Sequence, residues 1–149
     1  MENNKIGDLL NKLVEINNDR TVGYEKAVDE TDDSSLKTLF SKFASQSRSY
    51  RAELEGLVRS QGEDPIEGTT TSGKFYRAWM DIKAALTGKD RKAIIASCEF
   101  GEDVAKETYQ DVMKELNGVS TSILSVVERH YAEILDAHNQ VKKLRDTAA

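Results

Sequence analysis

Polar residues inside apolar helical stripes are the part of this sequence that could carry chemistry. His130 lies in the middle of an otherwise apolar stripe, and Arg20 lies on the inner stripe of an earlier helical segment. A buried polar group must find a hydrogen-bonding partner, and a buried charge must be paired. We expect Glu102, Tyr50 or Asn17 to hydrogen-bond His130 and to form a polar layer inside an apolar core.

Arg20 needs a carboxylate partner, and Glu102 or Glu99 is the obvious candidate. A pair with Glu102 would consume the carboxylate that a metal ion at this level would need. Cys98 is the single cysteine, with no histidine beside it in the pattern, so we interpret it as a buried structural residue. His138 falls at the edge of its stripe, and we expect it at the surface.

Four stretches with apolar residues every three or four positions must carry these side chains. The periodicity predicts helices over residues 4–30, 34–61, 90–117 and 120–147. Polar caps precede two of these helices, at Asp33 or Ser34 and at Ser120, and glycines follow two of them, at Gly62 and Gly118. Residues 62–89 form a long crossover, in which we expect a short helix at about 74–87.

The lengths of the connections determine the topology. The first two helices and the last two are each joined by a few residues, so each pair forms an antiparallel hairpin. The crossover is long enough to run the length of the bundle. The sequence therefore predicts an all-α, ferritin-like antiparallel four-helix bundle, built from two hairpins and spanning residues 1–149 as one domain.

Composition excludes several classes of protein. The chain has 149 residues and a formal net charge of -5, which argues against binding to nucleic acid because there is no basic excess to displace counterions. No apolar run approaches the roughly 18–20 residues of a membrane span, and no apolar signal core follows the first residues. We therefore expect a cytoplasmic protein that binds neither nucleic acid nor membranes.

The two hairpins also show a faint internal repeat, in which residues of the first hairpin align with residues of the second. The aligned pairs are Tyr24 with Tyr109, Asn17 with Glu102, Tyr50 with His130, and Ser47 with Val127.

This repeat resembles the pattern of ferritins and rubrerythrins, in which two helices each carry a glutamate and two each carry Glu-x-x-His. The resemblance implies ligands at six positions: Asn17, Ser47, Tyr50, Glu102, Val127 and His130. Only Glu102 and His130 keep strong metal-binding groups, and Tyr50 is an unusual third ligand. The resemblance thus implies at most a degenerate site for a single divalent metal or iron, made by Glu102, His130 and Tyr50.

Nearly the whole chain resembles a bacterial family of uncharacterised four-helix-bundle proteins with a ferritin-like fold. The segments that carry this resemblance are Gly23-Tyr24-x-x-Ala27, Arg77-Ala78-Trp79, Lys83 to Asp90, Cys98-Glu99-x-Gly101-Glu102-Asp103, Ala137-His138 and Leu144-Arg145-Asp146. The resemblance implies a fold and supplies no reaction.

Three functions stay open. The first is a non-catalytic bundle that acts as a homo-oligomer or through protein partners, with a stress-related role by analogy to the fold. The second is a metal-binding protein with the degenerate site, and the third is a rubrerythrin-like oxidoreductase. The residues contain no intact catalytic or di-iron constellation, which argues against an enzyme but leaves the question open. We expect no cofactor beyond that single metal.

Overall fold

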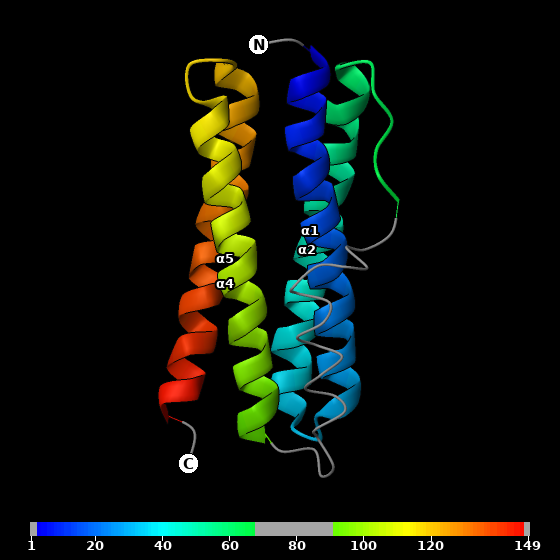
Figure 1. Ribbon diagram of the computed structural model, residues 1–149. Helices are drawn as coiled ribbons and strands as arrows, with labels where there is room; N and C mark the ends of the chain where they lie inside the picture. Colours follow the sequence, from blue (N-terminus) through cyan, green and yellow to red (C-terminus); the bar gives the residue numbers. More distant parts are fainter. Residues whose placement is uncertain (1–2, 68–90, 148–149) are drawn as a thin grey trace.

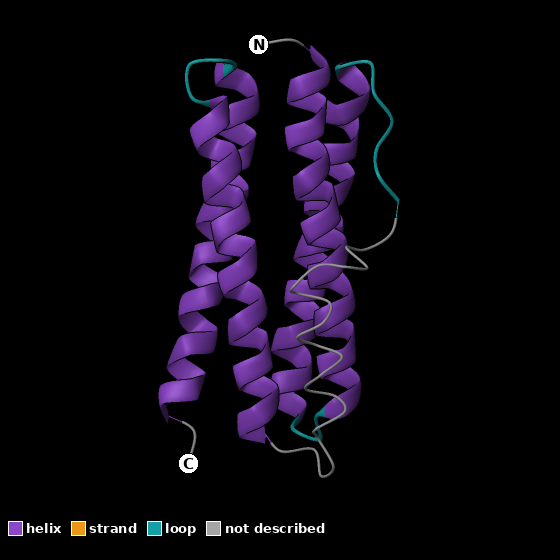
Figure 2. Ribbon diagram, viewed as in Figure 1, coloured by secondary structure: helices purple, strands orange, loops and turns teal. Residues whose placement is uncertain are grey.

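The computed structural model describes residues 3–67 and 91–147, and within these ranges it consists of four long helices and short connections (Figure 2). The helices are α1 (Asn3–Glu30), α2 (Ser34–Ser60), α4 (Arg91–Leu116) and α5 (Thr121–Thr147). Each observed bound lies within one residue of the predicted one. The predicted short helix at 74–87, with the resemblance segments at 77–79 and 83–90, lies outside the described residues.

Figure 1 shows the helices as two antiparallel hairpins that lie side by side, α1 with α2 and α4 with α5. Across the bundle, α1 packs closely along α4, whereas α2 comes close to α5 at only a few positions. The end of α2 and the beginning of α4 lie at opposite ends of the bundle. The two hairpins are therefore joined between opposite ends of the bundle, as the length of the crossover predicts.

Local capping sets the helix boundaries. The Asp33 carboxylate accepts hydrogen bonds from the backbone amides of Ser35 and Leu36, at 2.9 and 3.2 Å, and so begins α2. At the other end, Gly62 has a φ of 81°, and Glu63 donates its amide to the Val58 carbonyl. This Schellman arrangement leaves Gln61 as the cap and not as the last helical residue.

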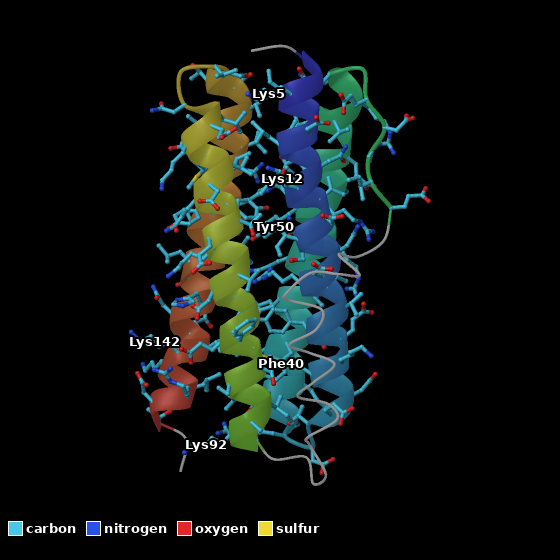
Figure 3. The ribbon with its side chains drawn as sticks, viewed as in Figure 1. Lys5, Lys12, Phe40, Tyr50, Lys92 and Lys142 are labelled. Carbon is cyan, nitrogen blue, oxygen red and sulfur yellow. The ribbon has the colours of Figure 1, made fainter. Side chains whose placement is uncertain are left out.

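The core is a continuous apolar layer along the bundle, because the inward stripes of all four helices face one another. Labelled lysines such as Lys12 and Lys142 lie on the outside, whereas Phe40 and Tyr50 lie within (Figure 3). A set of polar side chains is nevertheless buried in this core, mainly on α1 and at the middle of the bundle. It includes Asn17, Arg20, Ser47, Glu102 and His130.

Candidate functional site: a buried polar layer

A fully buried ion pair lies at the centre of the polar layer. The Arg20 Nε atom donates to Glu102 Oε1 at 2.6 Å, and both side chains are essentially inaccessible to water. Tyr24 donates its hydroxyl to the same oxygen, also at 2.6 Å. The predicted pairing of Arg20 with Glu102 is confirmed, and it joins α1 of one hairpin to α4 of the other.

The Arg20 guanidinium is held on several sides. Its Nη1 atom donates to Ser47 Oγ at 2.8 Å and to the Phe43 carbonyl at 3.3 Å. Its central carbon lies 5.3 Å from the ring centroid of Tyr24 and 5.6 Å from that of Phe43, within the range of cation–π attraction. Burial acts to lower the pKa of Arg20, but Glu102, Tyr24 and Tyr50 together raise it above its ordinary value, so Arg20 stays a cation.

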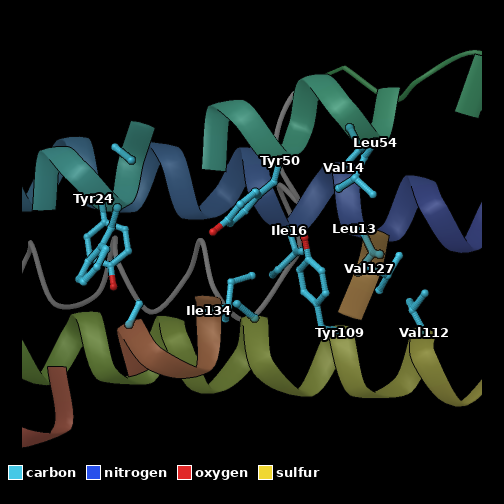
Figure 4. Packing of buried hydrophobic residues seen from close by; sticks show 14 of the residues in the cluster. Leu13, Val14, Ile16, Tyr24, Tyr50, Leu54, Tyr109, Val112, Val127 and Ile134 are labelled. Atoms are coloured by element: carbon cyan, nitrogen blue, oxygen red, sulfur yellow. The ribbon is translucent and has the colours of Figure 1, made fainter. Parts of the chain in front are cut away.

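The hydrogen bonds continue from Ser47 towards the other end of the layer. Ser47 donates to Asn17 Oδ1 at 3.0 Å, and Asn17 Nδ2 donates to the Tyr109 hydroxyl at 2.8 Å. The Tyr109 hydroxyl lies 3.2 Å from His130 Nδ1. Figure 4 shows the tyrosines of this region, among them Tyr50 and Tyr109, inside the bundle.

His130 ends the chain of hydrogen bonds near the surface. Its Nε2 atom lies 2.7 Å from Glu53 Oε1, and Glu53 also pairs with Arg129. The ring of Tyr50 stacks on the imidazole with 4.3 Å between the ring centroids. Burial lowers the pKa of His130, more than the Glu53 carboxylate raises it. The imidazole is therefore neutral at pH 7.

The neighbours of His130 also fix its tautomer. The Tyr109 hydroxyl oxygen accepts a hydrogen bond from Asn17 Nδ2, so the hydroxyl hydrogen is available for donation to His130 Nδ1. The remaining imidazole hydrogen then lies on Nε2 and is donated to Glu53. A protonated His130 would place a second donor against the Tyr109 hydroxyl, which the arrangement disfavours.

Tyr109, His130 and Glu53 follow the order hydroxyl, imidazole, carboxylate, which serves nucleophilic catalysis elsewhere. Here the hydroxyl is fully buried and already accepts a hydrogen bond from Asn17. Burial raises the pKa of Tyr109, which opposes formation of the nucleophilic phenolate. No substrate atom can reach this hydroxyl, so the geometry supports no acyl transfer.

All six positions that the resemblance assigns to metal ligands are buried. The structure does not bring Glu102 and His130 into contact. A chain of hydrogen bonds connects them instead, and it passes through Arg20, Ser47, Asn17 and Tyr109 in that order. Tyr50 contacts His130 through its ring, and burial raises the pKa of its hydroxyl. Metal binding at Glu102, His130 and Tyr50 stays a prediction.

The donor set does not fit a metal ion as it stands. One Glu102 oxygen is bonded to a cation, and both His130 nitrogens have partners. Within residues 3–67 and 91–147, no cluster of three or more His, Cys, Asp or Glu side chains is close enough to hold a metal. A metal would have to displace Arg20 from its only carboxylate partner among these contacts.

Sequence reasoning missed part of this layer. Glu53 lies outside the apolar stripe of α2, and only the pairing of α2 with α5 reveals it as a partner of His130. His138 was expected at the surface, and this was wrong: it is only 8% exposed, and its Nε2 lies 2.6 Å from Asp103. Cys98 is buried as predicted, and burial raises the pKa of its thiol.

Taken together, the fold and its core define a ferritin-like four-helix bundle. Residues 5–115 match the model of the family described as Domain of unknown function (DUF2383). The chain belongs to this family.

A solved structure of similar fold is a mutant of Dps1 from Mycobacterium smegmatis. The two chains are 16% identical, the match covers 96% of each, and the TM-score is 0.80. At this identity the likeness supports the fold alone. No curated protein matches the chain. Within the described residues, no helix is both long and apolar enough to cross a membrane.

Proposed function

We propose that the protein is a non-catalytic ferritin-like bundle in the cytoplasm that acts through assembly with its own copies or with protein partners. The observation that supports this most is that the Glu102 carboxylate is already hydrogen-bonded within the core. The one carboxylate at a family ligand position bonds Arg20 and Tyr24, and so it is not available for metal-based redox chemistry. A stress-related role is part of the proposal by analogy to the fold.

A second candidate is the degenerate mononuclear metal site. It is favoured by one buried atom that has no hydrogen-bond partner among the described residues, Glu102 Oε2. Buried polar atoms of this kind call for a ligand, a water or an ion. The rubrerythrin-like oxidoreductase has no such support, because the paired carboxylates of a di-iron centre are missing from the six positions.

Elemental analysis of the purified, untagged protein tests the proposal, with the His130→Ala variant measured in parallel. We expect both proteins to contain far less than one metal ion per chain. Near-stoichiometric metal in the wild type that is lost in His130→Ala would contradict the proposal and establish the second candidate. Sedimentation analysis of the same samples then measures self-assembly, and a monomer at all concentrations would restrict the proposal to other protein partners.

A further inference from the structure

Arg20 lies among the positions that the family pattern gives to metal ligands. It follows Asn17 by three residues, which places both side chains on one face of α1. Its guanidinium bonds Glu102 and Ser47 directly, and Ser47 in turn bonds Asn17. Three of the six ligand positions are thus connected around one organic cation.

The charges of the layer balance without any metal. Among the described residues, Glu102 is the only carboxylate bonded to Arg20, and both are almost completely buried. The next groups along the chain of hydrogen bonds, Ser47 and Asn17, carry no charge. Without the guanidinium, Glu102 would be a buried charge without a counterion, which proteins avoid by protonation or by binding a cation.

We propose that the Arg20 guanidinium takes the place of a metal cation in this core, and that its removal opens a site for a hard divalent cation anchored on Glu102. Three oxygens would surround the cation, namely Glu102 Oε1, Ser47 Oγ and the Phe43 carbonyl, all of which now bond Arg20. Glu102 Oε2 is buried and has no partner among the described residues. Carboxylate, hydroxyl and carbonyl oxygens suit Mg²⁺ and Mn²⁺ better than soft metals.

This inference rests on the proposed function, because it presumes that the wild type needs no metal at this site. It goes beyond the proposed function by explaining why no metal is needed. The Arg20 guanidinium cannot dissociate or change its oxidation state, whereas the metal ion that it replaces could do both. Arg20 is therefore a positioning residue that holds four helices around a fixed charge. Its contacts reach α1, α2 and α4 directly, and α5 through Tyr109 and His130.

Mn²⁺ is the probe for the test, with thermal melting and Mn²⁺ electron paramagnetic resonance as the readouts. Four proteins are compared after treatment with a chelator: wild type, Arg20→Ala, Glu102→Gln, and the double variant Arg20→Ala/Glu102→Gln. We expect Arg20→Ala to melt below the wild type and to recover several degrees as Mn²⁺ is added, with bound Mn²⁺ detected. The wild type and the double variant, which lacks the anchoring carboxylate, should not respond.

If Arg20→Ala does not fold without metal, recovery of its helical circular dichroism on refolding with Mn²⁺ supports the proposal. Failure to refold with Mn²⁺ overturns it if the double variant folds. A folded Arg20→Ala that neither binds Mn²⁺ nor gains stability from it also overturns it. The two proposals fail differently: metal bound by the wild type contradicts the proposed function, whereas metal bound by none of the four proteins contradicts only the role assigned to Arg20.

Discussion

At the scale of single residues, His130 shows how the core keeps a titratable side chain in its neutral form. The imidazole is buried, stacked on Tyr50, and bonded at both nitrogens to groups that suit its neutral form. The Glu53 carboxylate favours the protonated form, as a nearby anion always does, but burial has the larger effect on the pKa. The residue is therefore a neutral hydrogen-bond link, and not the general base that its neighbours suggest.

This arrangement predicts how stability depends on pH. The pKa of His130 is lower in the folded protein than the value of about 6.5 in the unfolded chain. Below pH about 6.5 the unfolded chain binds more protons than the folded protein, so the free energy of unfolding should fall as the pH drops towards the folded pKa. Denaturant unfolding between pH 7.5 and pH 5, values chosen on that basis, measures the effect.

The His130→Gln variant is the control, because it keeps hydrogen-bonding groups but does not titrate. It should lose less stability than the wild type over this range. The Glu53 carboxyl, whose pKa the His130 hydrogen bond lowers, would add its own loss only at more acidic pH. An NMR titration that finds the pKa of His130 above 6.5 in the folded protein would contradict the account.

At the scale of elements, α1 does more than contribute to the core. Its Asn11 side chain holds the beginning of the crossover: Nδ2 donates to the Asp64 carbonyl at 3.1 Å, and Oδ1 accepts from the Ile66 amide at 2.9 Å. These bonds replace backbone partners that the chain loses where α2 ends. They fix the direction in which the crossover leaves the end of the bundle.

The Asn11→Ala variant should therefore lose about 1–3 kcal/mol of stability, because two hydrogen bonds of about 0.5–1.5 kcal/mol each are removed. Urea unfolding measures the loss, and hydrogen exchange of the Ile66 amide should become faster. The exposed neighbour Lys12 offers a matched control, since Lys12→Ala shortens an adjacent side chain that makes no such bonds to residues 3–67 or 91–147. Equal stability of the two variants, with unchanged exchange at Ile66, would refute the role of Asn11.

The elements were predictable from the sequence because their signals are local. Apolar spacing set the four helices, and Asp33, Gly62 and Gly118 marked ends that the structure places within one residue. The bonding of Arg20 to Glu102 was also predictable, since a charge on an inner stripe must be paired. The bonds of Asn11 and of Glu53 were not, because each depends on the placement of segments more than 50 residues apart.

At the scale of the whole molecule, the polar layer follows the internal repeat. Tyr24 of α1 bonds Glu102 of α4, and Tyr109 of α4 bonds Asn17 of α1, so the aligned pairs exchange partners across the bundle. Such an exchange is what a pseudo-two-fold relation between the hairpins requires. The aligned rings of Tyr50 and His130 lie against each other, close to that axis.

Arg20 breaks this symmetry, because the aligned residue in the second hairpin, Ala105, has no charge. The departure places one cation beside one carboxylate at the junction of the two hairpins. On our proposal, this ion pair organises the core in the place of a metal. The effect of substituting either residue on the free energy of unfolding should then depend strongly on whether the other residue is present.

A double-mutant cycle in chelator-treated buffer tests that claim most directly, using Arg20→Met, Glu102→Gln and the double variant. Each single change should cost about 3–5 kcal/mol of unfolding free energy, because it leaves one buried charge unpaired. The double variant has no charge left and should cost much less than the sum of the two. Costs that add within about 0.5 kcal/mol would show that the residues act independently and would contradict the account.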